Sequence, residues 1–140
     1  MDNKELLKLA ERAREQSYCP YSGISVGAAL LTKSGKVYLG ANIENSAFSP
    51  SVCAERVALF KAISEGEREF LAIAVAGGKD AGAAVADFSP CGVCRQVMSE
   101  FSDGELEVIW GTEKEMTVRT LRELIPDAFG KAHTAFGGGL

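Results

Sequence analysis

Two apolar stretches constrain the fold of this chain more than any other feature. Residues 25–32 and 70–76 are almost entirely apolar, and neither alternates polar and apolar side chains as a strand with one solvated face does. Such runs are typical of strands that are covered on both faces. Both are too short to cross a bilayer as helices, so no membrane partner is expected. We therefore expect helices on both sides of a sheet that contains these strands.

The rest of the chain alternates predicted helices with predicted strands. A first amphipathic helix, which Asp2 or Asn3 can cap, ends before Pro20. Together with the two apolar strands, the later elements are predicted in this order: strand 25–32, strand 37–43, helix 52–65, strand 70–76, helix 91–101, strand 106–110 and helix 117–125. Between them, residues 77–89 are expected to form a loop, and residues 127–140 a Gly-rich C-terminal tail. The resulting α-β-β-α-β-α-β-α order predicts a single α/β domain over residues 1–140, with helices on both faces of a mixed sheet.

The segment 52–65 has little polar face for a helix. Its apolar residues are Val57, Ala58, Leu59, Phe60, Ala62 and Ile63. A helix of this kind is buried nearly all round. Because such burial is unusual in so small a domain, we expect other subunits to pack against it.

Charge and composition limit the partners further. The formal net charge is −4, the pI is near 5.1 and no cluster of Lys or Arg stands out, so binding to a nucleic acid polymer is not expected. The charged N-terminus lacks the apolar centre of a signal peptide, which predicts a cytoplasmic location. In that reducing compartment four residues are expected as thiols or metal ligands: Cys19, Cys53, Cys91 and Cys94.

Three of these cysteines stand at the starts of predicted helices. Cys53 precedes Glu55 by two residues in one helix, and Cys91 and Cys94 share one side of the first turn of another. The partial positive charge of a helix N-terminus favours the thiolate form that binds metal. Three thiolates leave one position of a tetrahedral zinc ion open, which is typical of a catalytic site. The spacing predicts one zinc ion per chain, with Glu55 as the general acid and base of a deaminase.

The cysteine pattern also has other interpretations. A redox-active CxxC pair normally follows a strand in a βαβ unit, and it would leave Cys53 and Glu55 without a role. A structural zinc site needs a fourth ligand. Cys19 lies in a turn after the first helix, where packing is its expected role, and His133 lies in the tail, where it is expected to be solvated. A non-catalytic protein in which zinc only joins two helices is kept as a less favoured alternative.

Arg56 is a candidate for tuning the metal. A zinc ion with three thiolates carries a net charge of −1, which weakens it as a Lewis acid. A guanidinium that donates hydrogen bonds to the sulfurs would withdraw part of that charge. Arg56 follows Glu55 directly, so we expect it beside the ligands; the alternative is an arginine exposed on the surface.

The sequence resembles the small homotetrameric zinc-dependent cytidine deaminases from the first helix to about Phe129. The segments that carry the resemblance are 20–22 (PYS), 26–30 (VGAAL), 42–45 (NIEN), 53–56 (CAER) and 90–96 (PCGVCRQ). The zinc motif alone marks the wider deaminase superfamily, and the NIEN segment makes the resemblance more specific. The resemblance implies a single-domain three-layer α/β/α fold with a mixed five-stranded sheet, and a homotetramer.

The resemblance also implies roles in binding a nucleoside. By this likeness Asn42 and Glu44 hydrogen-bond the sugar 3′-hydroxyl, the Ala54 N–H binds the base carbonyl and the Ser89 carbonyl meets the leaving amine. Phe129 is expected to reach the base in a neighbouring subunit. From the residues alone, an Asx-type turn with a solvated carboxylate is the preferred interpretation of Asn42 and Glu44. Phe129 would equally suit a packed tail aromatic.

Two positions depart from the family pattern. The family often has an aromatic residue where this chain has Ile24, and an aliphatic side chain facing the base cannot stack on it. It often has Tyr where this chain has Phe48, so this chain lacks a hydroxyl that would contact the sugar or a neighbour. Both departures bear on substrate affinity and range.

The sequence therefore predicts a hydrolase of pyrimidine salvage. The predicted reaction is the deamination of cytidine and deoxycytidine to uridine and deoxyuridine with release of ammonia. The alternative in the same class is a deaminase of another aminopyrimidine, such as blasticidin S or a modified nucleoside. Asn42 and Glu44 favour a substrate that carries a ribose.

Overall fold

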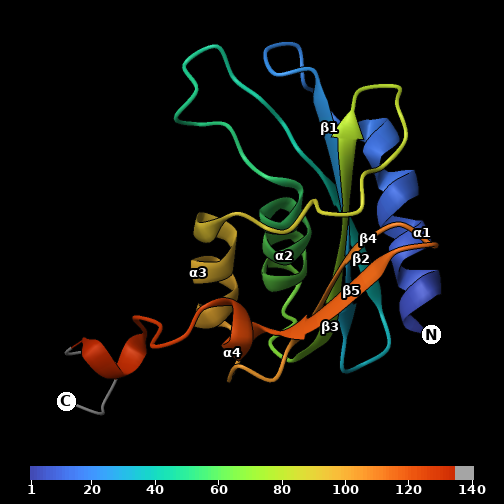
Figure 1. Ribbon diagram of the computed structural model, residues 1–140. Coiled ribbons are helices and arrows are strands. Elements are labelled where there is room, and N and C mark those ends of the chain that lie inside the picture. Colours follow the sequence, from blue (N-terminus) through green and yellow to red (C-terminus); the bar gives the residue numbers. More distant parts are fainter. Residues whose placement is uncertain (135–140) are drawn as a thin grey trace.

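A mixed five-stranded sheet forms the centre of the computed structural model, which describes residues 1–134 (Figure 1). The strand order is β2-β1-β3-β4-β5. The strands are β1 (Ile24–Thr32), β2 (Val37–Ala41), β3 (Phe70–Lys79), β4 (Glu107–Gly111) and β5 (Met116–Thr120). Only β3 and β4 pair in parallel, and the other neighbours are antiparallel. The predicted mixed sheet is confirmed.

Helices cover both faces of the sheet, as expected. They are α1 (Asn3–Ala13), α2 (Ala54–Ser64), α3 (Gly92–Glu100) and α4 (Leu121–Leu124), with short 3-10 turns at Arg14–Gln16 and Lys131–His133. Figure 1 shows α1 on one side of the sheet and α2 and α3 on the other. Within residues 1–134, no helix is both long and apolar enough to cross a membrane.

The two faces of β1 explain why its sequence shows no alternation. Ala28 and Leu30 point into the core beneath α2 and α3, whereas Ala29 packs with Leu7 and Ala10 of α1. Both sets are buried, so successive residues are all apolar. This arrangement confirms strands covered on both faces.

Glycines let the two helix layers approach the sheet closely. A Cβ atom on Gly27 would stand 1.9 Å from the Ala10 carbonyl oxygen of α1. A Cβ on Gly40 of β2 would stand 2.4 Å from the Ala54 carbonyl oxygen of α2. Because both neighbours are helix backbone, a side chain at either position would push a helix away from the sheet. Gly40 therefore helps to set the position of the helix that begins beside Cys53.

Two predicted boundaries are wrong. Residues 117–120, which we expected to open a helix, belong to strand β5 and pair with β4. The helix begins only at Leu121, where Thr120 and Glu123 form a capping box. The expected loop 77–89 also starts too early, since β3 continues through two glycines to Lys79.

Helix α2 is buried on one side only within a single chain. Its buried residues are Ala54, Glu55, Ala58, Leu59 and Ala62. Phe60 is 47% exposed, so burial nearly all round is not reached within this chain. The Phe60 ring of α2 is therefore left partly at the surface.

Candidate metal centre and active site

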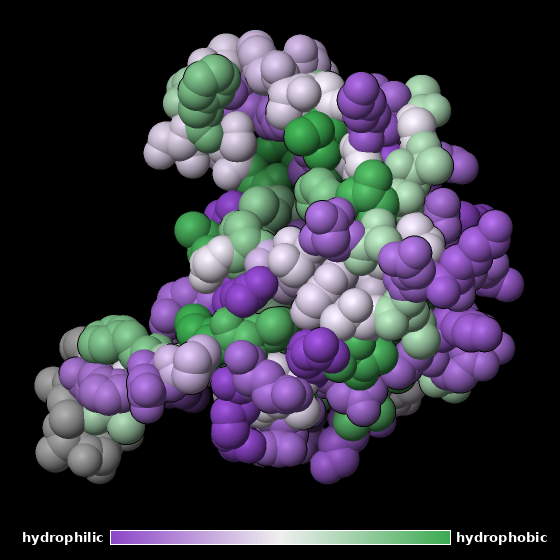
Figure 2. All heavy atoms as spheres, in the orientation of Figure 1, coloured by the Kyte–Doolittle hydropathy of each residue, from purple (hydrophilic) through white to green (hydrophobic). Residues whose placement is uncertain are grey.

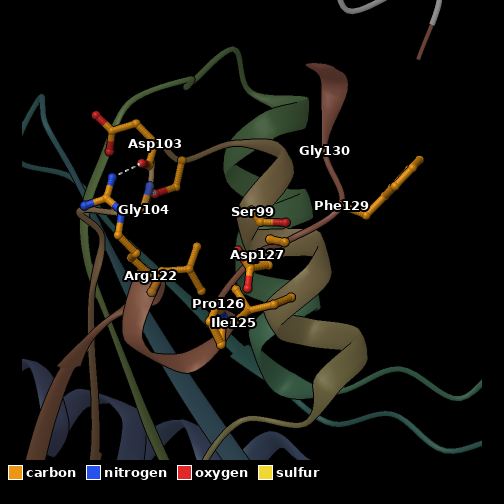
Figure 3. A pocket seen from close by; sticks show the side chains of 12 residues that line it. Ser99, Asp103, Gly104, Arg122, Ile125, Pro126, Asp127, Phe129 and Gly130 are labelled. Atoms are coloured by element: carbon orange, nitrogen blue, oxygen red, sulfur yellow. Dashed lines mark hydrogen bonds between the residues drawn. The ribbon is translucent and has the colours of Figure 1, made fainter. Parts of the chain in front are cut away.

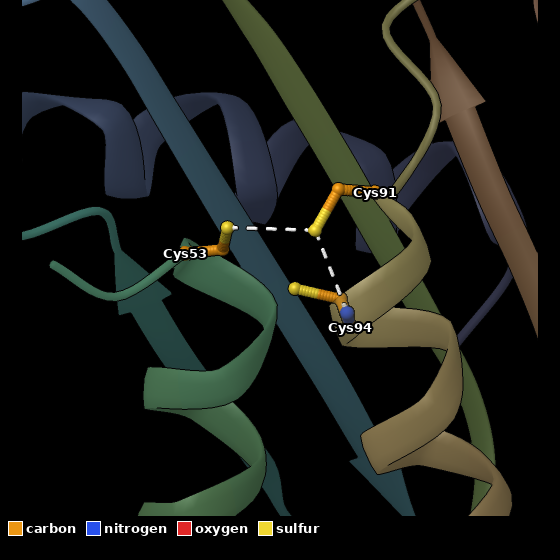
Figure 4. Close-up of side chains that lie close together, drawn as sticks. All are labelled: Cys53, Cys91 and Cys94. Atoms are coloured by element: carbon orange, nitrogen blue, oxygen red, sulfur yellow. Dashed lines mark hydrogen bonds between the residues drawn. The ribbon is translucent and has the colours of Figure 1, made fainter. Parts of the chain in front are cut away.

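Three cysteine sulfurs meet where α2 and α3 begin (Figure 4). The Sγ atoms of Cys53, Cys91 and Cys94 all lie within 4.8 Å of one another, and those of Cys53 and Cys91 are 3.7 Å apart. Cys53 precedes the first residue of α2, Cys91 precedes that of α3, and Cys94 lies in the first turn of α3. Tetrahedral bonds of about 2.3 Å to zinc would place sulfurs about 3.8 Å apart. The sulfur spacing and the all-thiolate donor set both fit zinc.

The Cys53 thiol of the cluster ionises more readily than an ordinary cysteine. Hydrogen bonding with Cys94, reinforced by Arg56 and Cys91, lowers the pKa of Cys53 to about 5. The same hydrogen bond with Cys53, together with burial, raises the pKa of Cys94. A metal ion must replace the proton that Cys94 holds, so we expect zinc uptake to release protons.

Glu55 is a buried carboxyl group beside these sulfurs. It lies in the first turn of α2 and is only 4% exposed. Burial raises its pKa to about 7, and the negative charge of Cys53 acts in the same direction. A carboxyl group with a pKa near neutrality can both accept and donate a proton, which is what general acid–base catalysis needs.

Arg56 points its guanidinium at the cluster. Its Nη2 lies 3.5 Å from Cys53 Sγ, a hydrogen bond to sulfur. Its Nε is buried and has no hydrogen-bond partner among the described residues. The geometry therefore favours charge withdrawal from the ligands over an arginine exposed on the surface.

Changing Arg56 to Gln should leave the zinc content intact while kcat falls about 10-fold, since the thiolate charge is no longer offset. Steady-state kinetics and metal analysis of the purified variant measure both quantities. Arg12→Gln, an exposed arginine of α1, is the matched control and should behave as the unmodified protein. An unchanged kcat in Arg56→Gln would show that the guanidinium only packs there.

A second group of predicted residues lies in the segment that follows β2. Both ends of the Asn42 side chain are occupied at 2.8 Å: Oδ1 accepts from the Val26 N–H, and Nδ2 donates to the Ile24 carbonyl. The Glu44 carboxylate accepts from the N–H groups of Tyr21 and Ser22 and from the Ser22 hydroxyl. The Ser22 hydroxyl is the main cause of a lowered Glu44 pKa.

These loops enclose a groove of about 390 Å³ lined by Tyr21, Ser22, Glu44, Phe48 and Ser51. The loop after β2 projects beyond the end of α2, and the molecular surface is hollowed beneath it (Figures 1 and 2). The sequence alone assigns no role to Ser22, although segment 20–22 (PYS) carries part of the family resemblance. The structure places its hydroxyl against Glu44.

The remaining predicted residues take the following positions. Ala54 is buried at the start of α2, where no side-chain hydrogen bond from Cys53 caps the helix N-terminus. Ser89 lies close to Cys91, and its hydroxyl faces Arg95 at 3.4 Å. Ile24 is 38% exposed at the start of β1. The roles expected of these three residues stay predictions.

Phe129 is not part of the metal cluster of its own chain. Its ring is exposed and stacks on His133 with centroids 5.3 Å apart. It borders a pocket of about 530 Å³ between Ser99 and residues 121–130, and Figure 3 shows the ring pointing away from that pocket. Ser99 is near the end of α3 opposite to Cys91, so this pocket is separate from the cysteines. The tail prediction beyond residue 134 lies outside the described residues.

Comparison with known proteins bears directly on this arrangement. Residues 1–110 match the family described as the cytidine and deoxycytidylate deaminase zinc-binding region. The chain belongs to this deaminase family. Cytidine deaminase from Sporosarcina psychrophila is 44% identical over 137 residues, covering 97% of each chain. Cytidine deaminase from Halalkalibacterium halodurans is 48% identical over 134 residues, covering 92% of this chain and 95% of the relative.

Solved structures agree with the fold of this deaminase. A crystal structure of cytidine deaminase from Burkholderia pseudomallei superposes with a TM-score of 0.84 at 44% identity. The match covers 92% of this chain and all of that one. The expected single-domain α/β fold and the zinc cofactor of the deaminase are thereby confirmed, with the cysteine cluster as the group that could hold one ion.

Proposed function

We propose that this deaminase hydrolyses cytidine and deoxycytidine to uridine and deoxyuridine with release of ammonia. The observation that carries the proposal is the buried Glu55 carboxyl, with a pKa near 7, beside three converging cysteine sulfurs. The groove at Glu44 supports a sugar-bearing substrate, because a carboxylate suits a free hydroxyl. Similarity to proteins named cytidine deaminase over nearly the whole chain supports the choice of base.

The chain's own residues would divide the reaction between them. When bound, zinc supplies the Lewis acidity that makes water nucleophilic at neutral pH. Glu55 takes a proton from the water that attacks C4 and delivers it to ring N3. The same carboxylate then carries the second proton to the amine as the C4–N4 bond breaks. Water and cytidine thus become uridine and ammonia.

Substrate positioning is proposed for the residues around this centre. The Ala54 N–H would bind the base carbonyl, and the Ser89 carbonyl would accept from the leaving amine. The Asn42 amide has a second hydrogen on Nδ2, which leaves it able to donate to the sugar while it holds Ile24. Glu44 would accept from the same hydroxyl.

An ultraviolet absorbance assay tests the function directly. The purified zinc-loaded protein is given cytidine, deoxycytidine, blasticidin S and a set of modified cytosine nucleosides. We expect turnover of the first two. Turnover of blasticidin S alone would favour the alternative substrate. If no compound is deaminated, the deaminase proposal is rejected, and a non-catalytic protein in which zinc only joins two helices is favoured instead.

We also propose a homotetramer in the cytoplasm. Phe60 of α2 is exposed and could pack against another subunit, and the exposed Phe129 could then reach a neighbouring site. The four cysteines are free thiols, which suits a reducing compartment. Light scattering should give a mass near 60 kDa, four times the 14.9 kDa of one chain. A mass of one chain would contradict the assembly.

Ile24→Phe should lower KM for cytidine about two- to tenfold, because an aromatic pair is worth about 0.5–1.5 kcal/mol beyond its buried area. Stacking changes little between substrate and transition state, so kcat should stay nearly constant. Steady-state kinetics on cytidine measure both constants. A raised KM would mean that residue 24 does not face the base.

A further inference from the structure

The two helices that carry the cysteines are anchored very differently. Helix α2 buries five residues and lies close against β2 at Gly40. Helix α3 buries only Cys94 and Met98. Pro90, which leads into α3, also has no N–H to donate to a backbone anchor. Packing alone therefore fixes Cys53 more firmly than it fixes Cys91.

Arg95 supplies the missing anchor. Its Nε donates to the Pro90 carbonyl at 2.8 Å, and its Nη2 lies 3.4 Å from the Ser89 hydroxyl. Its Nη1 donates to the Leu124 carbonyl at 2.9 Å, at the last residue of α4. One guanidinium thus joins the two residues before Cys91 to a helix 29 positions further along the chain.

We propose that Arg95 is a positioning residue that fixes Cys91 by tying the Ser89–Pro90 segment to the end of α4. It acts on the metal through this segment, since its three guanidinium contacts are with Ser89, Pro90 and Leu124. The inference rests on the proposed function in one respect only, because the same cysteine cluster must hold zinc.

Arginine is suited to this task by its shape. The planar guanidinium offers donors in a fixed fork, so it can serve acceptors from two chain segments at the same time. A lysine ammonium is a single point on a flexible stem and cannot span the same three acceptors. Arg95→Lys therefore keeps the charge and removes the bridge.

Zinc affinity, measured by competition with a chromophoric chelator, tests the inference. Groups that orient metal ligands from outside are worth about 10–100-fold in metal affinity, so Arg95→Lys should bind zinc at least about 10-fold more weakly. Gln96→Ala is the matched control: Gln96 binds the Phe129 carbonyl at 2.8 Å, so it too holds the C-terminal segment, without touching Ser89 or Pro90. It should keep the affinity of the unmodified protein.

Cobalt(II) in place of zinc gives a second measurement that does not depend on activity. Its visible bands report the coordination geometry, so they should shift in Arg95→Lys and stay unchanged in Gln96→Ala. If Arg95→Lys proves unfolded by circular dichroism, Ser89→Ala takes its place, and loss of that single hydrogen bond should weaken zinc binding about two- to tenfold.

The outcomes separate this inference from the proposed function. Unchanged zinc affinity and cobalt bands in Arg95→Lys would overturn the role of Arg95 and leave the deaminase intact. Equal losses in Arg95→Lys and Gln96→Ala would overturn it as well, because they would show that only attachment of the C-terminal segment matters. Failure of the unmodified protein to bind zinc would overturn both proposals.

Discussion

Glu55→Gln should lower kcat for cytidine by about 10²- to 10⁴-fold, the range that general acid–base catalysis contributes. The amide keeps the shape of the side chain at a position that is only 4% exposed, so the fold and the cysteine cluster should persist. It cannot take the proton from water or pass one to the ring nitrogen. The loss should therefore appear in kcat, with zinc content near one ion per chain.

Glu65→Gln is the matched control for this experiment. Glu65 is an exposed carboxylate at the other end of the same helix, and removing its charge should leave kcat unchanged. Stopped-flow absorbance of both variants, loaded with zinc to the same level, gives the comparison. Turnover within a few fold of the unmodified enzyme in Glu55→Gln would show that another group moves the protons.

Gly27→Ala should destabilise the protein by about 3 kcal/mol, at the upper end of what overpacking usually costs. The new methyl group would meet the Ala10 carbonyl oxygen and the Arg14 N–H at 1.9 and 2.7 Å, both of which are backbone atoms. Because a helix backbone cannot change rotamer to make room, α1 must move off the sheet. Urea unfolding at saturating zinc measures the loss.

The control for the glycine is Gly130→Ala. Gly130 has extended backbone, with φ of −155°, and no atom within 4 Å of an added Cβ. Its replacement should leave the free energy of unfolding almost unchanged. If Gly27→Ala unfolds at the same urea concentration as the control, then the α1 backbone does not lie close enough to Gly27 to meet an added methyl group.

Local patterns in the sequence were enough to predict most of the sheet. Strands β1 and β3 were predictable because burial on both faces leaves a continuous apolar run. Strand β5 was not, since Thr117, Leu121 and Leu124 also fall near helical spacing. These residues form a strand because they pair with β4, and no short window of sequence contains that contact.

The metal cluster was predictable for a related reason. Cys91 and Cys94 occupy one helical turn, so their spacing alone places two sulfurs together. The partners of Arg95 could not be predicted, because two of them are backbone carbonyls and every residue has one. The contact of Ser22 could not be predicted for the same reason as strand β5, because its partner Glu44 lies in a distant segment.

The groove at Glu44 bears on how this enzyme could be redesigned. Asn42 and Glu44 each hold the backbone of the chain around β1, so changing either residue alters the scaffold together with the sugar contact proposed for it. Phe48 is 70% exposed, and its ring touches Tyr21 with centroids 6.0 Å apart. Directed evolution toward nucleosides with altered sugars should therefore randomise Phe48 first, because its side chain can be exchanged without releasing the strand that the other two residues secure.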